Sequence, residues 1–357
     1  MLKSYKLIID QKKDFHFMTL FKHPGFSAKV VCDSVSPNGQ RLTTLEVVFP
    51  RMILAEFNTH RVLSKNSASS RAIPAVKQLR KILDNPYVPN YVGINESGMQ
   101  ASKFLSGDDL AHAQGNVYLK RDRAIVGALE DLVGREKVRE EFAEHLSGAL
   151  IDGFDSNGLE AVNRILDFYK ETIADSKKEG YEFPEGFLNI HKQTINRYLE
   201  PFMWHTVVVT ATTWGNFFAL RIHGDAQPEI CLPAEMIREA MESSTPAPLA
   251  YGEWHLPFVQ DDEKHMITAE NIDDWKYVSS GRCARVSYET HDGKRDIAKD
   301  IELSRDRLLP HGHMSPFEHV ATPVDYDYAG ETGNFAGWLQ FRKTIPGEAD
   351  YGQKNAS

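Results

Sequence analysis

The alternation of apolar and polar residues predicts a β-hairpin near the start of the chain. The segments "AKVVCDSV" and "RLTTLEVVF", residues 28–35 and 41–49, alternate with the period of strands. Between them, "SPNGQ" contains Asn38-Gly39, a pair that favours a tight hairpin turn. Pro50 then suits the start of a helix, and "RMILAEFNTHRVL" has apolar residues at roughly helical spacing. We therefore expect strand, turn, strand and helix, followed by a polar loop that closes at Pro74.

Helical spacing dominates the middle of the chain, about 107–200. The segments "RAIVGALEDLVG", "VREEFAEHLSGALIDGF" and "GLEAVNRILDFYKETIADSKK" repeat apolar residues at i, i+3 and i+4. We interpret them as a helical insertion that serves packing. The apolar run 201–220 contains His205 and Asn216, so it predicts a buried helix or strand rather than a membrane span. About 244–275 is rich in prolines and acidic residues and predicts a connecting loop within a single domain, 1–357.

Charge and cysteine content narrow the classes of partner and compartment. The formal net charge is -9 and the pI is near 5.9, so anions can bind only at a local basic site. This balance argues against nucleic-acid or membrane-surface partners. The three cysteines form no C-x-x-C pair, and the first residues lack the apolar core of a signal peptide. We expect a cytoplasmic protein.

The segment "THRVLSKNSASSRAIP", residues 59–74, gathers two arginines, a histidine, a lysine and five hydroxyl groups where the predicted helix ends. Guanidinium groups bind two phosphate oxygens at once, so this segment suits an anion such as phosphate. The alternative is a solvated loop whose arginine complements the helix dipole. The local pattern leaves both interpretations open.

Two further segments carry candidate chemistry. In "LRIHGDAQPEI", residues 220–230, Arg221 leaves an apolar segment and must either pair with a carboxylate, such as Glu229, or meet a ligand. In "PHGHMSPFEH", residues 310–319, three histidines lie close together, but their spacing is not that of a standard zinc site. Glu318 and His319 could equally be core or interface groups. We expect no metal.

Together these segments resemble one family, the flavin-dependent thymidylate synthases. That family carries Arg-His-Arg, seven intervening residues and Ser-Gly-Arg, and this chain has Thr59-His60-Arg61, seven residues and Ser69-Ser70-Arg71. "NFFALRIHGDAQPEI" is similar to N-F-x-x-L-R followed by A-Q-x-E-I, "HGHMSPFEH" to H-G-H-E-T-P-F-E-H, and "GRCARVSY" to R-A-A-R-V-S-F. The resemblance covers roughly 40–75, 195–243 and 276–345.

The order of these motifs is permuted relative to the family. The segments that come first in the family come last in this chain, and a strand followed by a helix is expected twice. One copy is "TTLEVVFPRMILAEFNTHR" and the other is "ATPVDYDYAGETGNFAGWLQFRK". The resemblance therefore implies the α/β (α+β) fold of the family, a mixed sheet with long helices, with a permuted or partly duplicated strand–helix unit.

The resemblance also implies roles for individual residues. Arg221 is the expected catalytic residue, against the pyrimidine. The expected substrate-binding residues are Ser69, Ser70, Arg71 and Arg221, joined by Gln340 and Arg342 of the tail. The expected FAD-binding residues are His60, Arg61, Val62, Asn216, His313, Ser315 and Glu318. Several nucleotide contacts of the family are replaced, with Glu56, Thr59, Ser67 and Thr212 in their places.

The implied reaction transfers a one-carbon unit from methylenetetrahydrofolate to C5 of dUMP, with hydride from reduced FAD and NADPH as reductant. A homo-oligomer, most often a tetramer, is implied as well. The replaced contacts keep a sister activity open, in which another pyrimidine nucleotide is methylated or hydroxymethylated. A non-catalytic nucleotide- or flavin-binding protein is the alternative of another class. The tail itself has a simpler alternative, a helix with a solvated end.

Overall fold

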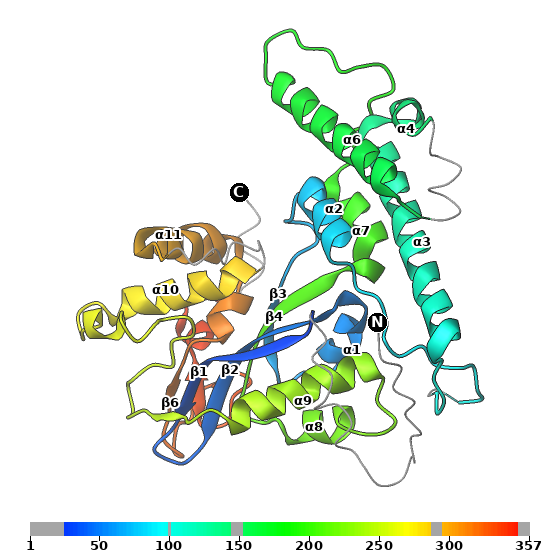
Figure 1. Cartoon of the computed structure of the whole chain (residues 1–357). Helices are drawn as coiled ribbons and strands as arrows, with labels where there is room; N and C mark the ends of the chain where they lie inside the picture. The colour runs from blue at the N-terminus through cyan, green and yellow to red at the C-terminus, as the bar shows by residue number, and fades with distance from the viewer. Residues whose placement is uncertain (1–24, 99–100, 144–152, 287–294, 349–357) are drawn as a thin grey trace.

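The computed structural model describes residues 25–98, 101–143, 153–286 and 295–348, and it has a mixed α/β architecture (Figure 1). A five-stranded sheet lies at the centre in the order β3-β4-β2-β1-β5. The pairs β3–β4, β4–β2 and β2–β1 are antiparallel, and β5 pairs with β1 in parallel. The sheet is therefore mixed, as expected. The strands are β1 (Ser27–Val35), β2 (Arg41–Pro50), β3 (Ser64–Ser67), β4 (Trp204–Ala211) and β5 (Ala247–Pro248).

The predicted hairpin is confirmed. β1 and β2 pair from Ser27↔Val48 to Val35↔Arg41, and the turn carries Gly39 at φ 79°. That backbone conformation is one that glycine adopts without steric cost. β2 then leads into a 3₁₀ turn, η1 (Arg51–Ile53), so the sequence places this end of the sheet correctly.

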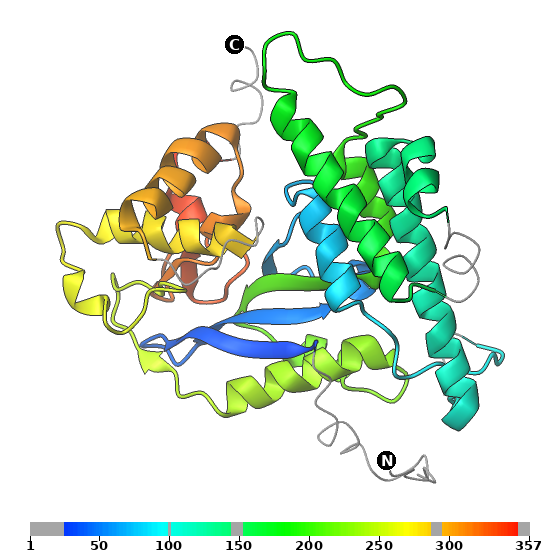
Figure 2. The ribbon, with the colours of Figure 1, turned by 45° about the horizontal axis from the view of Figure 1, so that its top comes forward.

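One face of the sheet is covered by α8 (Gly215–Arg221) and α9 (Pro228–Glu242), as Figures 1 and 2 show. The strands turn alternate side chains towards these helices, and Val207 and Val209 of β4 pack in the same core as Ile230 and Ile237 of α9. Val208 points to the other face of the sheet, where it packs against Cys283 and Val286. The run 201–220 is thus a strand followed by a helix.

The expected helical insertion forms a separate bundle beside the sheet (Figure 2). Its core is apolar and fully buried, with Leu129, Ile165 and Leu199 at 0% exposure, which follows from the i, i+3, i+4 spacing. An additional helix, α2, packs with this bundle. The helices are α2 (Ala75–Asp84), α3 (Gly107–Val133), α4 (Arg135–Glu141), α6 (Ser156–Asp175) and α7 (Lys192–Leu199).

The C-terminal part packs around a third apolar core and against the sheet. The loop expected over about 244–275 is largely irregular as far as 271 and contains η3 (Lys264–Met266), whereas 272–275 already belong to a helix. From residue 272 onward, helices and short helical turns lead to a two-stranded antiparallel pair. The elements are α10 (Ile272–Arg285), α11 (Ile297–Ile301), η5 (Glu302–Leu308), η6 (Leu309–His311), η7 (Ser315–Glu318), β6 (Ala321–Pro323), β7 (Trp338–Gln340) and η8 (Phe341–Thr344).

A buried polar chain joins this C-terminal part to the sheet. Ser34 Oγ and Thr44 Oγ1 lie 2.8 Å from the two ring nitrogens of His255. Thr44 Oγ1 is 2.7 Å from Thr210 Oγ1, which is 2.8 Å from Nδ1 of His319. Burial lowers the pKa of His255 and of His319 to about 3, so both rings are neutral at pH 7. His319 is therefore a core residue.

The helix expected over 51–63 is much shorter than its spacing suggests. η1 and the five-residue α1 (Leu54–Asn58) end before Thr59, whose Oγ1 donates to the Glu56 carbonyl at 2.6 Å. Ser64–Ser67, expected as a loop, is an edge strand paired with β4. A polar segment can form such a strand because the pairing uses backbone groups.

The second expected strand–helix unit is also different in the structure. Of the strand expected over 321–328, only Ala321–Pro323 forms, and it pairs with β7 (Trp338–Gln340) rather than leading into a helix. Gly337 has φ 73°, which interrupts helical geometry, and Trp338 is fully buried beside Leu42 and Phe335. The tail unit is thus a hairpin followed by a 3₁₀ turn. Within the described part of the chain, no helix combines the length and apolar character that crossing a membrane requires.

Candidate functional site

Residues 59–63 form the turn that brings the first motif onto the sheet edge. His60 is 6% exposed and packs edge-on against Phe217 of α8, with ring centroids 5.0 Å apart. Its neighbours Arg61 and Val62 face outward and are exposed. The buried histidine anchors the turn, and the arginine next to it stays accessible.

Arg221 meets this turn from the C-terminal end of α8. Its Nε donates to His60 Nε2 at 2.9 Å, and a terminal nitrogen lies 3.3 Å from Thr59 Oγ1. The Glu56 carboxylate is 3.8 Å from the guanidinium. Burial lowers the pKa of His60, and the positive charges of Arg221 and Lys65 lower it further. A neutral imidazole can accept the Arg221 hydrogen bond, so the two motifs hold each other in place.

The carboxylate that the sequence suggested for Arg221 has another partner. Glu229 lies in the first turn of α9 and accepts a hydrogen bond from Tyr87 Oη at 2.8 Å. Burial and the nearby Glu229 charge raise the pKa of Tyr87. Of the two alternatives for Arg221, pairing with Glu229 is excluded, because α8 and α9 turn the two side chains to different neighbours.

β3 brings three of the four motifs together. Asn66, which is 7% exposed, donates from Nδ2 to the carbonyl of Cys283 in α10 at 2.8 Å. Its Oδ1 accepts from Ser315 Oγ of η7 at 3.1 Å. The end of the fourth motif, 287–288, lies outside the described residues. Fold contacts thus join motifs that are more than 200 residues apart in the chain.

The tail residues Gln340 and Arg342 lie at the same edge. Gln340 is 2% exposed and donates from Nε2 to Ser64 Oγ at 2.9 Å and to the Glu318 carbonyl at 3.0 Å. Arg342 forms ion pairs with Glu318 at 2.6 Å and with Glu348 at 2.7 Å. Both side chains are held by protein groups, and their binding of substrate stays a prediction.

Lys65, which the sequence did not single out, lies between these groups. Its Nζ donates to the His60 carbonyl at 2.6 Å. Burial lowers the pKa of Lys65 to about 8, against the opposing effect of the Glu318 charge. Within Ser64–Ser67, buried and half-buried side chains alternate, with Ser64 and Asn66 buried. A strand of four polar residues is too short to be identified from the sequence, so the position of Lys65 could not be predicted.

The loop after β3 leaves hydrogen-bond donors free. The amides of Ala72 and Ile73 both donate to the Ser69 carbonyl. In the described part of the chain, the amides of Ser69, Ser70 and Arg71 meet no acceptor. Arg71 is exposed and, like Arg61, has no carboxylate within ion-pair distance among the described residues. Consecutive free amides beside an unpaired guanidinium are the groups that bind an anion.

The remaining predicted residues lie further out on the surface. Asn216, in the first turn of α8, and His313, before η7, are exposed, whereas Ser315 and Glu318 are half-buried. The structure therefore brings His60 to Arg221, Asn66 to Ser315, and Gln340 and Arg342 to Glu318. It leaves Arg61, Val62, Asn216 and His313 facing solvent.

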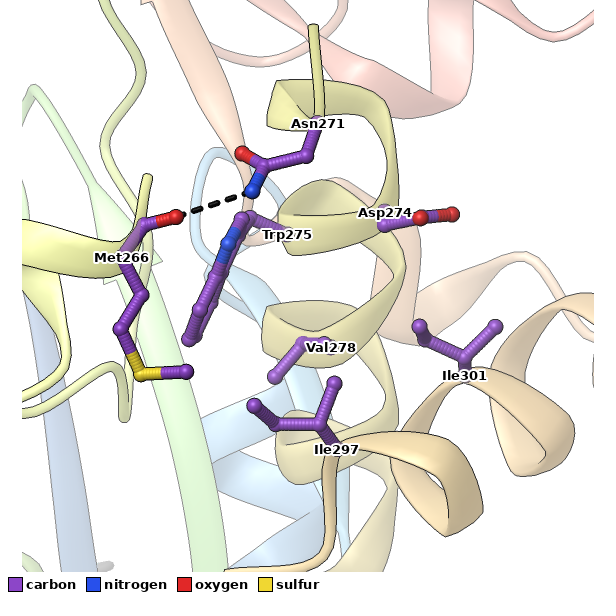
Figure 3. Close-up of a pocket in the computed structure, with 7 residues that line it drawn as sticks. All are labelled: Met266, Asn271, Asp274, Trp275, Val278, Ile297 and Ile301. Atoms are coloured by element: carbon purple, nitrogen blue, oxygen red, sulfur yellow. Dashed lines mark hydrogen bonds between the residues drawn. The ribbon is translucent and has the colours of Figure 1, made fainter. Parts of the chain in front are cut away.

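A small cavity of about 230 Å³ lies elsewhere, in the C-terminal part (Figure 3). Trp275 and Val278 of α10 line it together with Ile297 and Ile301, and Asn271 Nδ2 donates to the Met266 carbonyl beside Trp275 at 2.9 Å. The predicted site residues do not line this cavity. Among the residues that the structure describes, no group of three or more His, Cys, Asp or Glu side chains is placed to hold a metal ion.

Comparison with known proteins adds no family to this geometry. No protein-family model matches the chain. A search of curated proteins likewise gives no match.

Proposed function

We propose that the chain is a flavin-dependent thymidylate synthase-like enzyme, which transfers a one-carbon unit from methylenetetrahydrofolate to C5 of dUMP. The observation that carries the proposal is the meeting of separate motifs around residues 59–71. Arg221 contacts His60, Asn66 contacts Ser315, and the amide nitrogens of Ser69, Ser70 and Arg71 meet no acceptor among the described residues. Packing alone does not require free donors in the same segment as these contacts.

The donors present fit FAD and a nucleotide phosphate. Arg61 and Arg71 are exposed guanidinium groups without an ion-pair partner in the described residues, and each can bind two oxygens of a phosphate. We assign flavin binding to His60, Arg61, Val62, Asn216, His313, Ser315 and Glu318. FAD, when bound and reduced by NADPH, supplies the hydride. Since four of these residues face solvent in one chain, we also propose that a second copy completes the site within a homo-oligomer, a tetramer.

Arg221 has the role closest to the chemistry. Its side chain is 20% exposed, with Nε held by His60 and one terminal nitrogen directed at Thr59. A guanidinium fixed at two points can stabilise negative charge on a pyrimidine ring without reorganising during the reaction. Negative charge on the ring makes C5 nucleophilic. The Ser69–Ser70–Arg71 loop would meanwhile hold the phosphate.

Cytosine is a second candidate for the pyrimidine of the substrate, because the Glu56 carboxylate lies 3.8 Å from the Arg221 guanidinium. A carboxylate accepts hydrogen bonds and does not donate them, so it favours an exocyclic amino group over a carbonyl. This contact favours a sister activity on a cytosine nucleotide, with a methyl or hydroxymethyl product. It also leaves the same flavin chemistry and the same phosphate site in place.

Purified protein should carry a yellow chromophore that is released on denaturation and identified as FAD. With methylenetetrahydrofolate and NADPH, turnover is measured on dUMP, dCMP and their ribonucleotides. We expect Arg221→Lys to lower turnover by roughly a hundredfold or more, because lysine keeps the charge and loses the fork. Flavin occupancy of this variant should match that of the parent protein.

Three results would contradict parts of the proposal. Colourless protein that binds no added FAD would exclude the flavin chemistry. A flavoprotein that binds pyrimidine nucleotides without turning any of them over would favour a non-catalytic binding role, and Arg221→Lys at the parental rate would make Arg221 a structural residue.

A further inference from the structure

The helical insertion reaches the Ser69–Ser70–Arg71 loop through one fully buried side chain. Asn196 lies in α7 and has 0% exposure. Its Nδ2 donates to the Ser70 carbonyl at 2.6 Å and to the Ile73 carbonyl at 2.9 Å. The two carbonyls lie on either side of the loop's turn, so one amide group ties both ends of that turn to the bundle.

The orientation of the Asn196 amide follows from its partners. Both are carbonyl oxygens, which only accept hydrogen bonds, so the NH₂ group must face them. Its Oδ1 is then buried without a donor among the described residues. Burying an unpaired acceptor is unfavourable. An apolar residue would suit the bundle better, so the loop is the reason for an asparagine at this position.

Lys192, one turn earlier in α7, adds a third contact. Its Nζ donates to the Ala72 carbonyl at 2.9 Å. The carbonyls of Ser70, Ala72 and Ile73 are therefore all turned towards α7. On its other side the loop begins at Ala68, whose amide donates to the Thr206 carbonyl of β4 at 3.0 Å.

This arrangement sets the direction of the free amides. In a trans peptide unit the C=O and the following N–H point in opposite directions. Because Asn196 draws the Ser70 carbonyl towards α7, the Arg71 N–H of the same peptide unit points away from α7. That N–H has no acceptor within the described residues.

We propose that Asn196 is a positioning residue, which holds the loop so that the Arg71 N–H faces the phosphate group of a pyrimidine nucleotide. The inference rests on the proposed function and extends it, since it gives the helical insertion a role at the substrate site. Ile195 and Leu199, on either side of Asn196 in α7, are fully buried in the bundle core. The folded insertion thereby sets the shape of the loop.

The test compares Asn196→Asp with Gln193→Glu, the same amide-to-carboxylate change at an exposed position of α7. Asn196→Asp removes both N–H donors and sets carboxylate oxygens against two carbonyls. We expect the KM for dUMP to rise about tenfold or more, with kcat within about twofold and full FAD occupancy. Hydrogen exchange at 70–73 should become faster. Gln193→Glu should leave all four measurements unchanged.

The possible failures are distinguishable. If the parent protein binds no pyrimidine nucleotide, the proposed function fails and the inference falls with it. If the parent binds dUMP and Asn196→Asp binds it equally well, the inference alone is wrong. A lower thermal midpoint with an unchanged KM would likewise reduce Asn196 to a structural residue.

A second variant decides the case in which Asn196→Asp does not fold. Lys192→Met removes one donor from a half-buried side chain and keeps its apolar stem. The released Ala72 carbonyl should loosen the same loop less severely, and we expect a KM increase of about threefold. An unchanged KM together with unchanged hydrogen exchange at 70–73 would overturn the proposal.

Discussion

Residues 59–71 and 338–348 both combine amides and arginines, and both reach the η7 turn, yet their charges have different surroundings. In the first segment Arg61 and Arg71 have no carboxylate within ion-pair distance among the described residues. In the second, Arg342 is paired with Glu318 and Glu348, and Lys343 with Glu331 and Glu348. The first segment therefore retains the capacity to bind an anion, whereas the second uses its cations to hold the tail against the fold.

The difference shows that residue type alone does not identify a binding site. The sequence suggested Gln340 and Arg342 of the tail as additional substrate-binding residues. Gln340 is buried between Ser64 and the Glu318 carbonyl, and its binding of substrate stays a prediction. A cation whose charge is already neutralised contributes little to binding a second anion, because the existing pair must first be broken. The tail stabilises Glu318 and β3, and through them the site.

The largest expected effect comes from the first segment. The double change His60→Ala with Arg61→Ala removes the anchor of the turn and an unpaired guanidinium. We expect colourless protein that remains folded, as judged by circular dichroism and absorbance at flavin wavelengths. Lys343→Ala, which removes a paired cation from the tail, should leave the colour intact. Full FAD occupancy in the double variant would mean that residues 59–71 do not bind the flavin, and the proposed difference in function between the two segments would be wrong.

A pair of single substitutions should separate binding from stability. Arg71→Ala should weaken dUMP binding by about tenfold and leave the free energy of unfolding unchanged, since the residue is exposed and unpaired within the described part. Arg342→Ala should lower the free energy of unfolding by about 2 kcal/mol, because the half-buried Glu318 loses its ion-pair partner. Isothermal titration calorimetry measures dUMP binding, and urea denaturation measures the free energy of unfolding. If Arg71→Ala lowered only stability and Arg342→Ala lowered only binding, our interpretation of the two segments would be reversed.

Acid should loosen the two segments in different pH ranges. Burial lowers the pKa of His60 below 6.5, so the native ring binds fewer protons than the unfolded one. Stability from this group is complete above pH 6.5 and falls by at most about 1.4 kcal/mol per pH unit below it. In the tail, burial raises the pKa of Glu348, but the hydrogen bonds and charges of Lys343 and Arg342 together lower it below 4.5. Its contribution is lost only as the pH falls below 4.5.

Hydrogen exchange measured at pH 5.5 and pH 7, corrected for intrinsic rates, tests this separation. Residues 59–67 should become less protected at pH 5.5, while 338–345 should not. The buried His205, His255 and His319, whose pKa values burial lowers to about 3, affect global stability and so act on both segments alike. Equal loss of protection in the two segments would mean that His60 has no local effect.

The amino-acid sequence by itself determined the elements with strong local signals. Asn38-Gly39 and the alternation around it specified the hairpin, and apolar periodicity specified the helical bundle, because turn geometry and one-sided burial act over a few residues. It also marked His60, Arg221 and Ser315 as candidates, since their motifs were distinctive. These features depend on neighbours in the chain.

Tertiary structure decided which of these groups meet and which charges remain free. Ser64–Ser67 became a strand because β4 offered an unpaired edge, and the tail became a hairpin because Trp338 found a buried position beside Leu42 and Phe335. Glu229 paired with Tyr87, leaving Arg221 to His60, and Asn196 of the insertion reached the loop at Ser70. Such contacts join residues more than 100 positions apart, so their free energies arise only when the chain is folded.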